Sequence, residues 1–188
     1  AGGRLSELLE ELCLCGFVKK YTPYHLNENS KLARYQINDA YLQFFYKFIH
    51  PQLQNIQQGK FQQQATKALN LQEYQQWLGY AFERYCLNNM HRIAEILGFS
   101  GVQYIAGSYY NRATTKNAPG YQIDLLFERK DRVTTVCEIK YTQNETGTSV
   151  IEEFEKKLEQ LKSTNNKTIQ KVLISASGAD NVLIKRHY

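Results

Sequence analysis

Two β-rich segments joined by a very short loop constrain the fold of this chain more than any other feature. Residues 121–129 and 133–141 are rich in β-branched, aromatic and aliphatic side chains, and only residues 130–132 separate them. A three-residue loop pairs such segments as an antiparallel hairpin and fixes which residues face each other. We therefore expect Asp124 to lie opposite Glu138, with their Cβ atoms about 5 Å apart. A two-residue loop would break this pairing.

Alternation along the hairpin predicts which side chains share a face. Successive strand residues point to opposite faces of a sheet. Glu138 and Lys140 therefore share one face, and the expected pairing brings Asp124 to the same side. The other face is expected to be apolar and to pack inward, with Ile123, Leu125, Phe127, Cys137 and Ile139. The sequence thus predicts that three ionisable groups converge.

The predicted pairing of Asp124 with Glu138 suggests a particular chemistry. Two carboxylates this close repel each other unless a proton or a cation lies between them. Mg²⁺ is a hard cation that takes one or two carboxylates, waters and substrate phosphates as ligands. Such an ion lowers the pKa of a bound water and stabilises charge that develops on a phosphate. Lys140 would add a positive donor beside it, so we expect a magnesium site here.

The order of helical and β-rich segments predicts an α/β fold. The expected elements are a long amphipathic helix over 73–97, strands over 102–110, 121–129 and 133–141, a charged helix over 149–162 and a short strand over 171–175. A strand, a helix and a further strand require a right-handed crossover, which makes the last strand parallel to an inner one. We expect a mixed sheet flanked by helices.

The first fifty residues have a different pattern. Leucines at helical spacing end at Gly16, two short β-rich segments follow over 17–21 and 33–37, and an aromatic helix is expected over 39–49. Helix, hairpin and helix in this order are typical of the tail of a winged helix-turn-helix. The following residues, 51–72, carry eight glutamines. They are expected to form a linker or a connecting helix.

The site residues carry a resemblance to a known family. Gly120 opens the run Gly-Tyr-Gln-Ile-Asp-Leu-Leu, and this run followed by Glu138-Ile139-Lys140 resembles the PD-(D/E)XK signature of restriction-endonuclease-like folds. The resemblance implies that Asp124 and Glu138 bind Mg²⁺ or Mn²⁺ and that Lys140 positions or activates the attacking water. It also implies that a glutamate of the preceding helix joins the metal site, and Glu83 matches that position.

The chain departs from the family pattern in two places. Ile123 stands where the signature has its proline, which leaves the acidic residue in place. The helix expected over 149–162 lacks a clear glutamine-and-tyrosine motif. Substrate preferences of exonuclease-like or branch-specific members are therefore not transferred to this chain.

The chain as a whole resembles the C-terminal part of AAA+-like ATPases from archaea and bacteria. In these proteins a winged helix precedes a PD-(D/E)XK domain, and residues 34–49 match the junction after the wing. The resemblance implies a partial winged helix-turn-helix over 1–50, a linker or connecting helix over 51–72 and a nuclease-like domain over 73–188. We expect a fragment of a longer protein, whose missing N-terminal ATPase region is a partner. No P-loop motif occurs in the sequence, so no nucleotide site is expected here.

Composition sets the remaining expectations. The formal charge of +5 is compatible with a polyanionic partner such as DNA without requiring one. Four cysteines without paired spacing indicate reduced thiols rather than a zinc site. No segment reaches the length of about 20 apolar residues that spans a membrane, so we expect a soluble cytoplasmic protein with no membrane partner. The sequence leaves homo-oligomerisation open.

Two functions follow from these patterns. The first is metal-dependent hydrolysis of a phosphodiester bond, with DNA as the expected substrate. The alternative is an inactive nuclease-fold module that binds or regulates an ATPase, because an exposed Glu-x-Lys on a strand is usually a plain ion pair. Tyr109, Tyr110, Arg112 and Lys116 fit a nucleic-acid strip or ordinary packing, and we favour packing. The charged residues over 152–159 are expected to form a helix surface without an assigned function.

Overall fold

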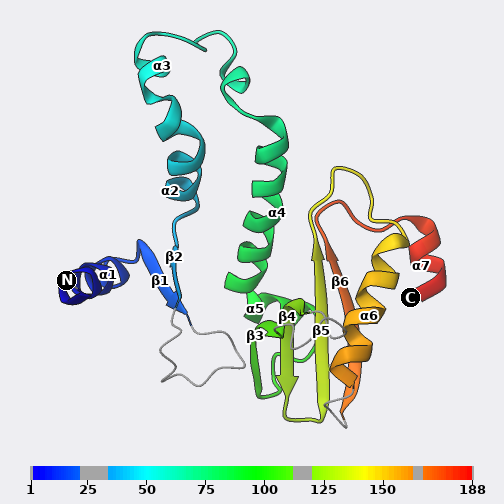
Figure 1. Cartoon of the computed structure of the whole chain (residues 1–188). Helices are drawn as coiled ribbons and strands as arrows, with labels where there is room; N and C mark the ends of the chain where they lie inside the picture. Colours follow the sequence, from blue (N-terminus) through cyan, green and yellow to red (C-terminus); the bar gives the residue numbers. More distant parts are fainter. Residues whose placement is uncertain (1, 22–33, 112–119, 163–166, 188) are drawn as a thin grey trace. The chain divides into compact units, whose positions relative to one another are not determined.

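The chain divides into two compact units, one up to Trp77 and the other from Leu78 onward. The computed structural model describes residues 2–21, 34–111, 120–162 and 167–187 (Figure 1). Each unit has its own sheet, with two strands in the first and four in the second. The predicted class is therefore confirmed: the protein is a mixed α/β chain in which helices flank a mixed sheet.

The first unit begins with a helix and a two-stranded antiparallel sheet. Helix α1 (Gly2–Leu14) ends before Gly16, whose φ of 77° lies in the left-handed region that glycine tolerates. Strands β1 (Val18–Tyr21) and β2 (Arg34–Ile37) pair with Val18 opposite Ile37. The order of helix, hairpin and helix matches the expected one. Residues 22–33, between these two strands, lie outside the described part of the chain.

Short helical turns make up the rest of the first unit. Asp39 caps α2 (Ala40–Phe44) by accepting a hydrogen bond of 2.7 Å from the Leu42 N–H. The turns that follow α2 are η1 (Phe45–Ile49, a π-helix), η2 (His50–Gln52), α3 (Leu53–Gln57) and η3 (Ala65–Ala68). The glutamine-rich segment is thus partly helical. The aromatic rings of Phe44, Phe48, Tyr74 and Trp77 pack together in this unit, with centroids 5.2 to 6.2 Å apart.

The expected helix over 73–97 is two helices. Helix α4 (Leu71–Asn88) runs from the first unit into the second, and α5 (Met90–Ile96) follows it. Asn89 interrupts them with a φ of −114° and a ψ of 29°, and its side-chain amide donates to the Tyr85 carbonyl over 2.8 Å. An asparagine side chain that bonds the local backbone competes with the helix, which explains the break.

The second unit contains a four-stranded sheet in the order β3-β4-β5-β6. Its strands are β3 (Tyr104–Asn111), β4 (Tyr121–Arg129), β5 (Val133–Lys140) and β6 (Thr168–Ser175). β3, β4 and β5 pair antiparallel, whereas β6 runs parallel to β5 after the crossover through α6 (Ser149–Lys162). The parallel placement of the last strand is confirmed. A further helix, α7 (Asn181–His187), follows β6 and was not expected.

Both faces of this sheet are buried. On one face, side chains of α4 and α5 such as Cys86 and Ala94 pack with Phe127 and Cys137 of the strands. On the other face, Phe154, Leu158 and Leu161 of α6 pack with Leu126 and Val136. The face that carries Glu138 is therefore covered by a helix and not open to solvent, and any charge on it needs a partner.

A register shift in β4 corrects the predicted face of Ile123. Between the pairs Gly107–Leu126 and Tyr109–Ile123, β4 has two residues where β3 has only Ser108. The extra residue turns Ile123 to the face of Leu126 and α6 instead of the face of Leu125. Strict alternation failed here because a bulge inserts one residue into a strand and reverses the faces beyond it.

The cysteines are free, as expected. Cys86 and Cys137 are buried in the core between α4 and the sheet, whereas Cys15 is exposed. Within the described ranges, every helix is either too short or too polar to cross a lipid bilayer.

Candidate metal-dependent hydrolytic site

The hairpin of β4 and β5 places the central acidic residues. Its loop is residues 130–132, as predicted, and Arg132 adopts a φ of 66° at the last loop position. A three-residue hairpin loop typically ends on a residue in this left-handed conformation. Leu125 pairs with Cys137, which confirms the expected register. Asp124 directly precedes Leu125 in β4, and Glu138 directly follows Cys137 in β5.

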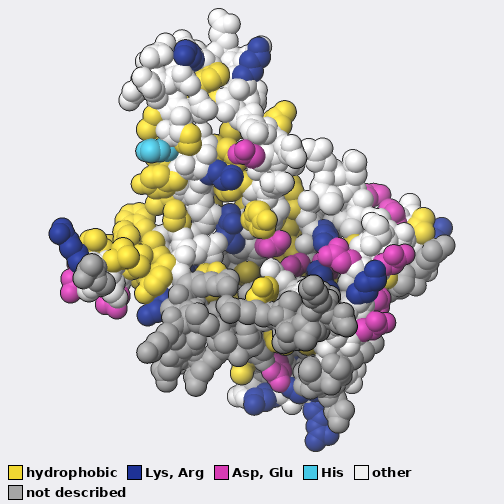
Figure 2. Space-filling view, viewed as in Figure 1, with side chains coloured by type: hydrophobic (Ala, Val, Ile, Leu, Met, Phe, Trp, Pro, Cys, Tyr) yellow, Lys and Arg dark blue, Asp and Glu magenta, His cyan; other side chains and the backbone are white. Residues whose placement is uncertain are grey.

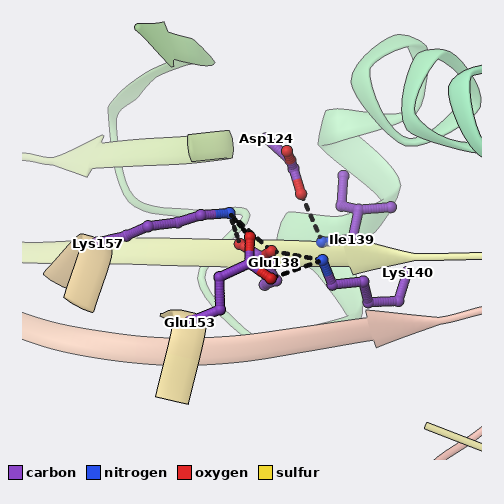
Figure 3. A network of polar contacts seen from close by, with 6 residues as sticks. All are labelled: Asp124, Glu138, Ile139, Lys140, Glu153 and Lys157. Carbon is purple, nitrogen blue, oxygen red and sulfur yellow. Dashed lines mark hydrogen bonds and ion pairs between the residues drawn. The ribbon is translucent and has the colours of Figure 1, made fainter. Parts of the chain in front are cut away.

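Glu138 is almost fully buried, with 1% of its surface exposed. Two ammonium groups hold its carboxylate from opposite sides (Figure 3). Lys140 Nζ lies 2.9 Å from Oε1, and Lys157 Nζ lies 2.8 Å from Oε1 and 3.0 Å from Oε2. A buried carboxylate is tolerated only when it is paired and hydrogen-bonded in this way. The Glu-x-Lys pair therefore joins a buried carboxylate to a partly exposed lysine, and it differs from a fully solvated surface pair.

Lys157 is the site residue that the sequence did not reveal. It comes from α6, directly before the fully buried Leu158, and 16% of its side chain is exposed. Glu153 lies one turn earlier, with Oε1 3.4 Å from Lys157 Nζ and Oε2 3.9 Å from Lys140 Nζ. The i,i+4 charge spacing was visible, but it indicated only a helix surface. The position of Lys157 beside the apolar stripe of α6 was the signal that could have revealed its place in the site.

The hydrogen bond and charge of Glu138 determine the protonation of Lys157. Burial lowers the pKa of the Lys157 ammonium, but the hydrogen bond and charge of Glu138, with further help from Asp124 and Glu153, more than offset this. The pKa of Lys157 is raised overall, so the residue is a cation at neutral pH. Lys157 and Glu138 thus form a buried ion pair between α6 and β5.

Asp124, inside β4, is hydrogen-bonded to β5. Its Oδ2 accepts a hydrogen bond of 2.9 Å from the Ile139 backbone N–H, and 9% of the residue is exposed. Burial raises the pKa of Asp124 and the charge of Glu138 adds to this, although the Ile139 hydrogen bond, Lys157 and Lys140 act in the opposite direction. The carboxylate is therefore fixed in position and is costly to ionise.

Glu83 of α4 is coupled to the same group. Burial raises the pKa of Glu83, and the negative charge of Asp124 contributes further. Glu138 also raises the pKa, whereas Lys140 and Arg84 lower it. The fold therefore brings all four predicted site residues into one electrostatically coupled group, from α4, β4 and β5. Perturbed carboxylates of this kind cluster at functional sites, although structural ion-pair networks also perturb them.

A network at the carboxyl ends of β5 and β6 sets the start of α6. Thr146 forms an isolated parallel bridge with Ala179, and its hydroxyl lies 2.8 Å from the Ser175 hydroxyl. The Ser177 hydroxyl donates to the Thr142 carbonyl. These contacts hold the segment between β5 and α6 against the segment after β6. They fix the N-terminal start of α6, about two turns before Lys157.

The donor chemistry of the acidic group fits a hard divalent cation. Asp124, Glu138 and Glu83 offer only carboxylate oxygens, which Mg²⁺ and Mn²⁺ prefer. Across the part of the chain that the structure describes, no three such side chains are already gathered as a metal-binding cluster. In this structure the Glu138 oxygens bind the two lysines. Figure 2 shows acidic and basic side chains intermixed on the visible face of the second unit.

Of the four residues considered for a nucleic-acid strip, Tyr109 and Tyr110 are described by the structure, and they differ in burial. Tyr109 packs against the core under α6, with its ring 5.9 Å from that of Tyr121. Tyr110 is 42% exposed. Arg112 and Lys116 lie outside the described residues. The favoured interpretation of packing is confirmed for Tyr109.

Comparison with known proteins identifies the family. The family model described as archaeal and bacterial proteins of unknown function (DUF234) matches residues 45–157, more than half of the chain. The chain belongs to this family. An uncharacterized protein of Methanocaldococcus jannaschii, MJECL04, is 32% identical over 95 residues. The match covers 47% of this chain and 21% of that protein, so the chain spans about a fifth of its relative. No solved structure gives a significant match.

Proposed function

We propose that the second unit is a metal-dependent phosphodiesterase of the PD-(D/E)XK type that hydrolyses DNA. The observation that carries this proposal is the position of Lys140 Nζ, 2.9 Å from the buried Glu138 carboxylate, with Asp124 on the adjacent strand β4. An acidic residue on one strand and a Glu-x-Lys on the next are the parts that such a reaction needs. Glu83, coupled to Asp124, is the fourth member of the site.

Each residue has a distinct role in the proposed reaction. Asp124, Glu138 and Glu83 would hold Mg²⁺ or Mn²⁺, which supplies a water of lowered pKa and stabilises charge on the phosphate when bound. The Lys140 ammonium donates a hydrogen bond to the attacking oxygen or to a phosphate oxygen. The attacking water oxygen forms a bond to phosphorus and loses its proton to solvent. The bond from phosphorus to the leaving sugar oxygen breaks, and that oxygen takes up a proton.

A second candidate is an inactive module of the same fold that binds or regulates an ATPase. The contact that favours it is the Lys157 ammonium, which already neutralises Glu138 through both oxygens. A buried ion pair of this kind also serves as a structural connection between α6 and the sheet. The match to about a fifth of a longer relative is compatible with either function as part of a larger protein.

A cleavage assay separates the two functions. The chain is incubated with linear, single-stranded and branched DNA, and with RNA, in the presence of Mg²⁺, Mn²⁺ or EDTA. Cleavage that needs the cation and falls at least about a hundredfold in Lys140→Ala supports the nuclease. The matched control is Lys130→Ala, because Lys130 is exposed in the hairpin loop. Cation binding without cleavage of any substrate supports the inactive module.

A further inference from the structure

Lys157 makes contacts with Glu138 that a metal ligand would have to give up. Its ammonium donates to Oε1 over 2.8 Å and to Oε2 over 3.0 Å, while Lys140 reaches Oε1 at 2.9 Å. A carboxylate coordinates a cation through these same oxygens. Since the two lysines approach from opposite sides, both oxygens face a positive charge (Figure 3). A divalent cation and Lys157 therefore compete for Glu138.

Burial makes this competition strong. Only 1% of Glu138 and 16% of the Lys157 side chain are exposed, so water screens their attraction weakly. An ionised carboxylate in such a place needs a counterion whether or not metal is present. Lys140 alone reaches one of the two oxygens. Lys157 thus completes the neutralisation of Glu138 in the metal-free chain.

When the Lys157 ammonium leaves Glu138, a second carboxylate, that of Glu153, is close enough to pair with it. Glu153 lies one turn earlier on α6, its Oε1 is 3.4 Å from Lys157 Nζ, and 60% of its side chain is exposed. A small movement of the flexible lysine side chain toward Glu153 would free both Glu138 oxygens. The ammonium would then remain at the edge of the site, on the solvent side of Glu138.

On the basis of the proposed function, we propose that Lys157 is the internal counterion of Glu138 and that a divalent cation displaces it. Lys157 is then a positioning residue: it holds the carboxylate in place before the cation binds and sets how tightly the cation is bound. The assignment adds α6 to a site that otherwise consists of α4, β4 and β5. It also predicts that affinity for the cation is limited by a residue of this chain.

Mn²⁺ titration of variants tests the proposal. Lys157→Met removes the charge and keeps most of the side-chain length, so Mn²⁺ should bind about tenfold more tightly than to the original chain. Lys157→Arg keeps a cation and should stay within about threefold of the original affinity. Lys156→Met is the matched control, because Lys156 is the exposed neighbour on α6, and its affinity should not change. Binding is followed by calorimetry or by the electron paramagnetic resonance of free Mn²⁺.

The outcomes separate this inference from the proposed function. Unchanged or weaker binding by Lys157→Met, with normal binding by the original chain, overturns the inference and leaves the nuclease proposal standing. Tighter binding by Lys156→Met as well would show a general charge effect and would also overturn it. Failure of the original chain and of Lys157→Met to bind Mn²⁺ overturns both proposals. Binding by Lys157→Met alone supports the inference.

A measurement on the unaltered chain covers the case in which Lys157→Met does not fold. Lysine labelling by reductive methylation, read by mass spectrometry, reports how accessible each ammonium is. Saturating Mg²⁺ should increase the labelling rate of Lys157 several-fold and leave that of Lys156 unchanged. Equal protection of Lys157 with and without Mg²⁺, under conditions in which Mg²⁺ binds, would overturn the inference.

Discussion

Asp124 Oδ2 accepts a hydrogen bond of 2.9 Å from the backbone N–H of Ile139, and this bond joins the interior of β4 to β5. The paired residues of the two strands end at the neighbouring pair, Leu125 and Cys137. The Asp124 carboxylate thus extends the pairing of β4 with β5 at the point where the register between β3 and β4 shifts. Bulges next to active sites often redirect a side chain in this manner. The hydrogen bond fixes Asp124 beside Glu138.

Asp124→Asn should make the folded chain more stable at neutral pH by a few degrees of melting temperature. Burial raises the pKa of Asp124, so the folded state disfavours its ionised form. The amide oxygen of asparagine can still accept the Ile139 hydrogen bond. The same change should weaken Mn²⁺ binding, because one carboxylate is lost. Thermal unfolding and Mn²⁺ titration measure the two effects.

The gain in stability should depend on pH with a definite sign. A carboxylate whose pKa is raised by folding gives its full contribution below about pH 4 and loses it as the pH rises through the raised folded pKa. The two proteins should therefore melt alike near pH 3, and the asparagine variant should be more stable at pH 7. Equal melting temperatures at both pH values would show that ionised Asp124 is not destabilising.

Glu83→Gln should weaken Mn²⁺ binding less than Asp124→Asn does. Glu83 is half-buried on α4, whereas Asp124 is buried and held by the Ile139 hydrogen bond. Because Glu83 is the more exposed of these two proposed ligands, its loss should lower the affinity about tenfold. Glu95→Gln, an exposed change on α5, is the control. A larger loss than in Asp124→Asn would give Glu83 a central place.

The hairpin loop should tolerate glycine but not a β-branched residue at position 132. Arg132 has a φ of 66°, a conformation that glycine adopts freely and valine adopts at a cost. Arg132→Val should lower the free energy of unfolding by about 1 to 2 kcal/mol. Arg132→Gly should stay within about 0.5 kcal/mol of the original. Urea unfolding measures both, and equal stability of the two variants would contradict the assigned loop conformation.

Leu158→Ala should destabilise the second unit by about 3 kcal/mol. Leu158 is fully buried between α6 and the sheet, directly beside Lys157. The cavity should also loosen α6 and increase the exposure of Lys157 to labelling. Ile184→Ala on α7 is the control, since Ile184 is 45% exposed and the change should cost about 0.5 kcal/mol or less. A loss of less than 1 kcal/mol in Leu158→Ala would argue against close packing of α6.

Much of the site follows from local sequence rules. The length of the loop over 130–132 and the alternation of the two strands gave the register that pairs Leu125 with Cys137. The same rules placed Asp124 and Glu138 as the pair next to Leu125 and Cys137. The parallel position of β6 follows from the handedness of the crossover. These features depend on neighbouring residues and on chirality, which a single sequence contains.

Other features depend on contacts that the sequence does not show. Ile123 changes face because β4 has an extra residue opposite Ser108, and nothing in a strand of apolar residues marks the bulge. The helix break at Asn89 comes from one side-chain hydrogen bond to Tyr85. Lys157 belongs to the site only because α6 packs across β5, which brings together residues far apart in the chain. Charge spacing within one helix cannot predict such a contact.

Anomalous diffraction from crystals soaked in Mn²⁺ is the most direct measurement of the divalent-cation site. We expect a peak bound by the carboxylates of Asp124 and Glu138, with Lys140 beside it and the Lys157 ammonium moved away from Glu138. A peak at another place would rule out this metal site. So would a Mn²⁺-saturated crystal in which Glu138 still binds only Lys140 and Lys157.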